Sequence, residues 1–178
     1  MSDLKQLIKN IEQWAEDRNL IKGSTPKKQF IKLMEEFGEL CSGVSKNKID
    51  VIKDSIGDCF IVLTILAKQN GTNIYQSEKE VERIYNGLKD RLYENETIEY
   101  SICHISEGIG GLGRTFILTG NINEDVKKRR ILFVLSGLVY ITYNYNIDFW
   151  DCVKAAWDEI KDRKGRMVDG VFVKEGDL

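Results

Sequence analysis

The amino-acid sequence predicts an all-α fold, and two observations carry this prediction. The 178 residues contain a single proline, and apolar residues recur every three to four positions over long segments. Because proline interrupts helices and 3.6 residues is the helical period, both features favour helices along most of the chain. The length suffices for one ordinary core. We therefore expect a single all-α domain over residues 1–178.

The first predicted helix runs from about Asp3 to Asn19, and a turn at Lys22-Gly23-Ser24 separates it from the second. Thr25 is typical of an N-cap, and Pro26 of a first helical position. Apolar residues mark the face that each helix would bury: Leu4, Leu7, Ile8, Ile11 and Trp14 in the first, and Phe30, Leu33, Phe37, Leu40 and Val44 in the second.

The third predicted helix covers about Asp50 to Gln69 and ends at Asn70-Gly71. From Cys59 onward it is apolar on nearly every side, which is typical of a helix buried all round. Ser77 is the expected N-cap of a fourth helix, amphipathic through Val81, Ile84, Leu88 and Leu92. These four helices would form a first half over residues 1–95.

The second half, residues 96–178, repeats this succession of amphipathic helices. Helices are expected from about Thr97 to Leu118, Glu124 to Tyr145 and Asp148 to Lys164. The residues after Lys164 are punctuated by glycine and partly β-like, so we expect a short ordered extension there.

Short matches between the halves indicate a degenerate tandem duplication. Phe37-Gly38-Glu39-Leu40 resembles Ile109-Gly110-Gly111-Leu112 at an offset of 72 residues, and Gly57 resembles Gly137 at an offset of 80. A longer loop around Asn121 to Asn123 would supply extra residues. A duplicated chain would form a pseudo-dimer of two helical hairpins; a homodimer is left open.

Composition excludes several classes of partner. A net charge of −2 gives no general attraction to nucleic acid or to anionic membranes, so a phosphate-bearing partner would need a local site. The longest apolar stretch, Cys59 to Ala67, is too short to span a bilayer. The charged N-terminus lacks a signal-peptide pattern, and the four cysteines form no CxxC pair. We expect reduced thiols and a cytoplasmic protein.

A first acidic cluster, Glu35-Glu36-Phe37-Gly38-Glu39, lies on the second predicted helix. At 100° per residue, Glu36 borders the apolar face and Glu39 lies beside it, whereas Glu35 points away from the core. Taken alone, such a cluster is usually a solvated helix face.

A second cluster is harder to explain as surface. Asp54 and Asp58 are four residues apart on the third helix, next to its buried segment, where a carboxylate is costly unless something pairs with it. Packing the two helices together would gather four acids, and no lysine or arginine lies on the Asp54–Asp58 stripe. Oxygen-only ligands point to Mg²⁺, with Mn²⁺ as a second choice. The alternative is that basic residues from elsewhere in the fold neutralise these acids.

At this point the residues resemble a family. MazG-like pyrophosphohydrolases, relatives of dimeric dUTPases and of phosphoribosyl-ATP pyrophosphohydrolase, carry a helical EExxE and then an ExxD on the next helix. Glu35-Glu36-Phe37-Gly38-Glu39 matches the first motif in full. Asp54-Ser55-Ile56-Gly57-Asp58 matches the second except that Ser55 occupies the glutamate position, where Asp54 would supply the carboxylate. The resemblance covers about residues 1–72 and the last twenty residues.

The resemblance implies a MazG-like helical bundle that cleans nucleotide pools. The reaction would hydrolyse a nucleoside or deoxynucleoside triphosphate between its α and β phosphates, giving the monophosphate and pyrophosphate. Glu36, Glu39, Asp54 and Asp58 would hold Mg²⁺, and Glu36 or Glu39 would also be the catalytic base.

Four further residues are candidates for binding the substrate. Lys164, Arg166 and Lys174 could contact the outer phosphates, although a solvated basic helix end explains them as well. Trp14 could stack on the base, although its place on an amphipathic helix also fits a core residue.

The second half lacks the acids, since Gly111 corresponds to Glu39 and Leu138 to Asp58, with Glu107 near the position of Glu35. Its Gly108-to-Gly113 segment spells GxGxxG, but no βαβ unit surrounds it. Two alternatives to the NTP hydrolase remain: a non-catalytic helical protein that binds a nucleotide, a metal or a protein partner, favoured by Ser55, and a hydrolase of a phosphoribosyl nucleotide.

Overall fold

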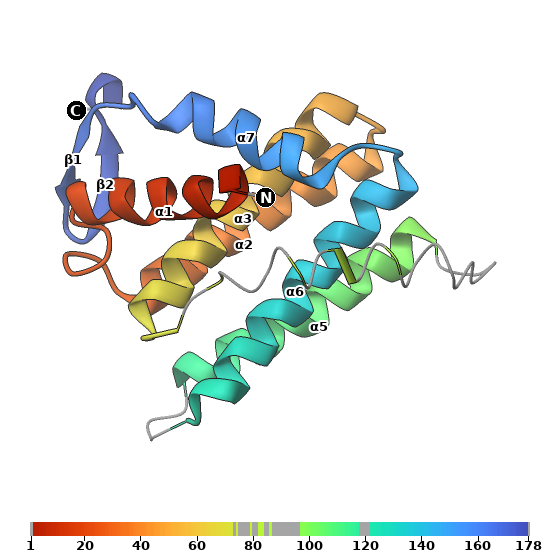
Figure 1. Ribbon diagram of the computed structural model, residues 1–178, viewed down its shortest axis with the longest axis horizontal. Helices are drawn as coiled ribbons and strands as arrows, with labels where there is room; N and C mark the ends of the chain where they lie inside the picture. The colour runs from red at the N-terminus through yellow and green to blue at the C-terminus, as the bar shows by residue number, and fades with distance from the viewer. Residues whose placement is uncertain are drawn as a thin grey trace.

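The computed structural model describes residues 2–72, 97–117 and 122–177, together with residues 74, 79, 82, 83 and 86. The described chain is mostly helical, which confirms the all-α prediction, and it ends in one small antiparallel sheet (Figure 1). Most of the fourth helix expected from Ser77 lies outside the described residues, of which 79, 82, 83 and 86 are helical. The elements are α1 (Ser2–Asp17), α2 (Pro26–Ser45), α3 (Ile49–Gln69), α5 (Ile98–Ile117), α6 (Glu124–Asn144), α7 (Phe149–Ile160), β1 (Gly165–Val168), β2 (Val171–Lys174) and a 3₁₀ turn (Glu175–Asp177).

Local signals in the sequence explain where α2 begins. Thr25 has an extended backbone and its hydroxyl accepts a hydrogen bond from the backbone N–H of Lys28, and Pro26 is the first helical residue. This arrangement satisfies one of the donors that a helix start leaves open, and proline costs nothing there because its missing N–H would have no partner. The predicted N-cap is therefore confirmed.

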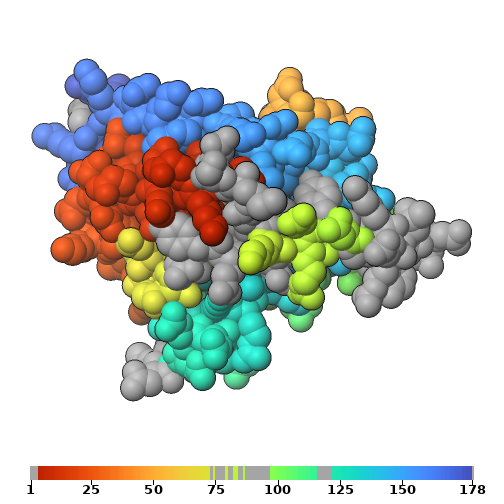
Figure 2. All heavy atoms as spheres, viewed as in Figure 1, coloured from red at the N-terminus to blue at the C-terminus, as the bar shows by residue number. Residues whose placement is uncertain are grey.

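Helix α3 lies at the centre of the first half and contacts α1, α2, α6 and α7. Its residues from Cys59 to Ala67 are all buried, as predicted. Gly57 allows the closest approach of α7, because a Cβ there would lie 2.4 Å from the backbone oxygen of Cys152 and 2.6 Å from the Cβ of Ala156. On the face of the molecule shown in Figure 2, α7 and α1 adjoin one another.

Helices α5 and α6 form a second hairpin that lies beside the first (Figure 1). Glycines of both helices permit close packing: a Cβ at Gly137 would lie 2.3 Å from Ile105, and one at Gly113 would lie 2.9 Å from the ring of Phe30 on α2. The GxGxxG string therefore lies within a helix, and two of its glycines, Gly108 and Gly113, permit close packing against α6 and α2. None of the described helices is long and apolar enough to cross a membrane.

The two hairpins have matching helix lengths. Helices α2 and α5 both have 20 residues and begin 72 residues apart, whereas α3 and α6 both have 21 residues and begin 75 apart. The offset of 80 inferred from Gly57 and Gly137 is therefore wrong for these helices, because Gly57 faces α7 and Gly137 faces α5. The bounds align Asp58 with Phe133 rather than Leu138.

The C-terminal extension is a β-hairpin, so the partly β-like prediction is confirmed. Asp169 and Gly170 form its turn, both with positive φ of 49° and 79°, the backbone that an Asp-Gly hairpin turn requires. Helix α7 ends at Ile160, short of the predicted Lys164. Backbone oxygens of the segment after α7 bond instead to the guanidinium of Arg18.

Candidate functional site

A pocket of about 350 Å³ lies between α2, α3, the end of α7 and the β-hairpin. All four carboxylates predicted as metal ligands, from both α2 and α3, line it. Both acidic and basic side chains line this pocket. The acids are Glu35, Glu36, Glu39, Asp54, Asp58 and Glu159, and the bases are Lys28, Lys32, Arg163 and Lys174.

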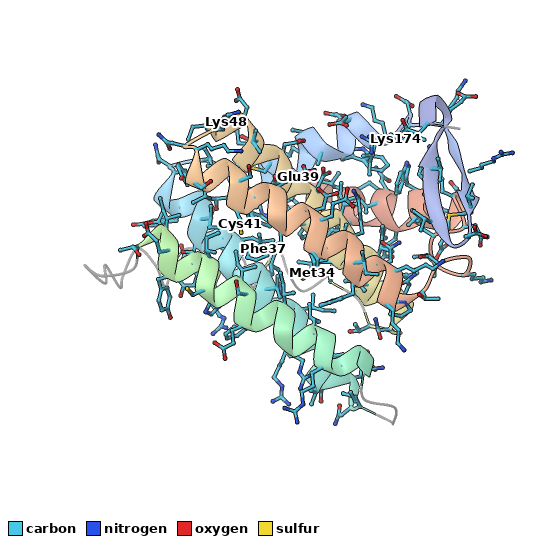
Figure 3. The ribbon with its side chains drawn as sticks, turned by 180° about the vertical axis from the view of Figure 1, so that it is seen from behind. Met34, Phe37, Glu39, Cys41, Lys48 and Lys174 are labelled. Atoms are coloured by element: carbon cyan, nitrogen blue, oxygen red, sulfur yellow. The ribbon has the colours of Figure 1, made fainter. Side chains whose placement is uncertain are left out.

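The carboxylates differ in their burial in the way that helical geometry predicts. Glu36 is 4% exposed, Asp58 is half-buried, and Glu39 and Asp54 are exposed. Figure 3 shows Glu39 on the edge of α2 away from the α5–α6 hairpin, whereas Phe37 and Cys41 lie toward that hairpin. The acids therefore lie along the border between the core and the pocket.

Burial and mutual repulsion raise the pKa of three of these acids. Burial, and then the charges of Glu36 and Asp54, raise the pKa of Asp58 to about 7. Burial raises the pKa of Glu36, opposed by its contact with Lys32. Burial and the charges of Glu159 and Glu39 raise the pKa of Asp54. Burial is the largest cause of all three shifts, and the neighbouring carboxylates add to it.

Ser55 occupies the position where the resemblance has a glutamate. It is 1% exposed, its hydroxyl has no hydrogen-bond partner among the described residues, and it is not part of the pocket lining. Asp54, one residue earlier, does line the pocket. A carboxylate at position 55 would be buried away from the other acids, so Asp54 is the residue of this helix turn that can join Asp58.

Lys32 is a site residue that the sequence reasoning missed. Its Nζ lies 2.6 Å from Oε1 of Glu36 and 3.0 Å from Oε1 of Glu35. The signal was available, because Lys32 and Glu36 are four residues apart on one helix, the spacing of helical ion pairs. Arg163 pairs with Glu159 in the same pocket. Basic residues thus neutralise part of the acidic cluster.

The donor set suits a hard divalent cation, since it consists of oxygen atoms only. Among the described residues, however, no group of three or more His, Cys, Asp or Glu side chains stands in an arrangement that could hold a metal ion. The carboxylates share one pocket without converging, and the Lys32 ammonium lies beside the most buried of them, Glu36.

The apolar part of the pocket includes Trp14 and Phe172, whose ring centroids lie 6.1 Å apart. Trp14 is 8% exposed, its Nε1 donates to the backbone oxygen of Ile160, and the guanidinium of Arg18 lies 4.7 Å from its ring centroid. Trp14 is thus largely a packed residue that contributes an edge to the pocket. Phe172 is the more exposed of the two rings.

Of the three basic residues predicted near the C-terminus, only Lys174 lines the pocket (Figure 3). Lys164 and Arg166 are exposed outside it. The hairpin register explains this difference: Lys174 is opposite Gly165, and Arg166 is opposite Val173. Because side chains alternate between the two faces of a strand pair, Arg166 lies on the other face. Arg163, just before the hairpin, takes a place in the pocket instead.

Comparisons with known proteins give little further information. No family model matches the chain, and no solved structure matches it. A similar protein is the "Uncharacterized 18.2 kDa protein in rep-hol intergenic region" of Haemophilus phage HP1 (strain HP1c1), 84% identical over 70 residues. The match covers 39% of this chain and 43% of the phage protein, so it spans less than half of either.

Proposed function

We propose that this protein is a Mg²⁺-dependent, MazG-like nucleoside triphosphate pyrophosphohydrolase. One observation carries the proposal: Glu36, Glu39, Asp54 and Asp58 come from two helices into one pocket, and basic residues line that same pocket. Phosphoanhydride substrates require both features, because carboxylates hold the metal while cations bind the phosphate oxygens that the metal leaves free.

The four carboxylates would hold Mg²⁺. When bound, the ion would neutralise the triphosphate and lower the pKa of a coordinated water. Glu39 is our choice of general base, because it is exposed to the pocket and forms no ion pair among the described residues, whereas Glu36 is buried against Lys32. Glu39 would take the proton of the attacking water, whose oxygen would bond to the α phosphorus. The bond from that phosphorus to the oxygen bridging the α and β phosphates would break, and pyrophosphate would leave with the electron pair.

The basic and aromatic residues of the pocket would bind the rest of the nucleotide. Lys28, Arg163 and Lys174 line it and can donate to the phosphate oxygens. The half-buried ring of Phe172, with the edge of Trp14, would offer an apolar surface for the base.

A second candidate is a non-catalytic protein that binds nucleotides. The pairing of Lys32 with Glu36 favours it, since a pocket that supplies its own cation can bind a phosphate chain without holding a metal. Both candidates use the same basic residues to bind phosphates. They differ in that only the hydrolase requires Mg²⁺.

A substrate panel tests the proposal and separates these candidates. The purified protein is incubated with each common NTP and dNTP, with Mg²⁺ or with EDTA, and monophosphate and pyrophosphate are measured. We expect Mg²⁺-dependent release of pyrophosphate from at least one nucleotide, abolished in Glu39→Gln and retained in Glu124→Gln, an exposed α6 acid outside the pocket. Nucleotide binding without turnover would favour the non-catalytic candidate.

A further inference from the structure

A second pocket of about 350 Å³ lies in the groove between α5 and α6. Its lining shares no residue with the acidic pocket and comes from these two helices. The lining includes Glu107, Gly108, Gly111, Arg129, Arg130 and Phe133. The volume of this groove is that of a site for a small molecule.

The groove occupies the place in the α5–α6 hairpin that the acidic pocket occupies in the α2–α3 hairpin. Helix α5 begins 72 residues after α2, and α6 begins 75 residues after α3. With these offsets, the four acids predicted as metal ligands correspond in order to Gly108, Gly111, Arg129 and Phe133. All four of these residues line the second pocket. The two hairpins thus form pockets from corresponding positions, but with different side chains.

These side chains reverse the charge of the groove. Arg129 stands at the position that corresponds to Asp54, is exposed, and forms no ion pair among the described residues. Arg130 instead donates to the backbone oxygen of Gly111 and to the hydroxyl of Thr115 on α5. The guanidinium of Arg129 is therefore the group that a ligand can reach. Because its donors form a planar fork that matches phosphate oxygens, it suits a phosphate rather than a cation.

Phe133 gives the groove a flat apolar surface. It is 37% exposed, and it stacks on the ring of His104 with centroids 3.9 Å apart. The glycines leave room beside it, since a Cβ at Gly108 would lie 3.0 Å from Cδ1 of Phe133. Exposed aromatic rings of this kind bind nucleobases by stacking.

We propose that the α5–α6 groove is a second nucleotide site, which binds its ligand without a metal ion. Arg129 binds the phosphates, and Phe133 stacks on the base. The presence of a guanidinium and an exposed ring in one pocket favours a nucleotide over a simple anion or a wholly apolar molecule. This inference requires neither hydrolysis nor metal binding in the acidic pocket.

The one histidine of the chain allows this site to be observed by itself. Because His104 stacks on Phe133, a base that binds there should shift the imidazole resonances. Protein without a purification tag is titrated with ATP, GTP, CTP and UTP in EDTA at constant pH, and ¹H–¹³C nuclear magnetic resonance is recorded. We expect a saturable shift with at least one nucleotide. The affinity should fall about tenfold in Arg129→Gln and stay unchanged in Lys9→Gln, an exposed α1 residue.

A second variant tests the reversed charge. Gly111→Glu places an acid at the position that corresponds to Glu39, and its Cβ would meet the stem of Arg130 at 3.8 Å, an ordinary contact. The new carboxylate should repel the phosphates and weaken the His104 response. Circular dichroism verifies that both variants are folded.

Three results would overturn the proposal: no saturable shift with any of the four nucleotides, equal affinities of wild type and a folded Arg129→Gln, or equally tight binding of inorganic triphosphate or of the free nucleoside. The last result would show that only one end of the ligand is recognised. Because EDTA removes divalent metal ions, loss of the His104 response would leave the proposed hydrolase standing. Failure of hydrolysis in the substrate panel would likewise leave this second site standing.

Discussion

The indole Nε1 of Trp14 donates a hydrogen bond of 2.9 Å to the backbone oxygen of Ile160, the last residue of α7. One turn later on the chain, the guanidinium of Arg18 donates to the backbone oxygens of Lys161 and Arg163. Helix C-termini leave carbonyls without intrahelical partners, and these two side chains donate to the backbone oxygens of Ile160 at the end of α7 and of Lys161 and Arg163 beyond it. The segment that carries Arg163 and leads to the hairpin is thereby fixed against the pocket.

Arg18→Met should therefore loosen this segment. Loss of the hydrogen bonds leaves partly buried carbonyls without partners, at a cost of about 1–2 kcal/mol in the free energy of unfolding. Urea denaturation would measure it, with Lys9→Met, an exposed α1 residue, as the control. A midpoint equal to that of wild type would show that the segment is held by other contacts.

Asp58 should make stability depend on pH. Its pKa in the folded protein is about 7, above the ordinary value of 3.8, so between these values the folded state keeps a proton that the unfolded chain has lost. The free energy of unfolding should fall as pH rises from about 4 to 7 and then level off.

Asp58→Asn removes the pH-dependent contribution of Asp58 to the free energy of unfolding. We expect the variant to be more stable than wild type at pH 8, by about 1–3 kcal/mol once solvent screening at this half-buried position is allowed for. The difference should shrink toward pH 4. Thermal unfolding at pH 4, 6 and 8 without divalent cations would measure it, and a constant difference across this range would contradict the pKa.

Two glycine substitutions should change the free energy of unfolding in opposite directions. A Cβ at Gly57 would lie 2.4 Å from the backbone oxygen of Cys152, so Gly57→Ala must push α3 and α7 apart and should destabilise by about 1–3 kcal/mol. A Cβ at Gly110, on α5, would have none of the described atoms within 4 Å, so Gly110→Ala should stabilise by about 0.5–1 kcal/mol because alanine favours the helix. Guanidinium denaturation of both variants checks this contrast; a loss in both would point to a general effect of replacing helical glycines.

Ser55→Ala tests whether the serine in the glutamate position of the ExxD motif contributes to stability or activity. The hydroxyl is buried and has no hydrogen-bond partner in the described part of the chain, so its removal should leave the protein equally stable or stabilise it by about 1 kcal/mol. Hydrolysis, once established, should be unchanged because Ser55 does not line the pocket. A marked loss of activity in a folded Ser55→Ala protein would assign the hydroxyl a role that its position does not suggest.

Features encoded by local spacing were predictable. The Thr25-Pro26 start of α2 depends on neighbouring residues alone, and the four carboxylates share a pocket because they lie on facing sides of two helices in sequence. The ion pair of Lys32 with Glu36 is also local, since the two residues are four apart on α2, but the lack of a basic residue on the Asp54–Asp58 stripe does not bear on the helix that carries Glu36.

Features that depend on long-range contacts were not predictable. Helix α7 ends early where Arg18, more than 140 residues away in sequence, bonds to the segment that follows it. The exclusion of Arg166 from the pocket follows from the register of a hairpin that no local pattern specifies. The repeat offset was misjudged because the two matched glycines accommodate different partner helices.

The position of bond cleavage tests the central claim most directly. The nucleotide that is turned over in the panel would be incubated with Mg²⁺ and followed by ³¹P nuclear magnetic resonance. The account predicts that signals of the nucleoside monophosphate and of pyrophosphate grow together in equal amounts, and that neither appears with Glu39→Gln. Growth of the diphosphate and orthophosphate signals instead would contradict a pyrophosphohydrolase.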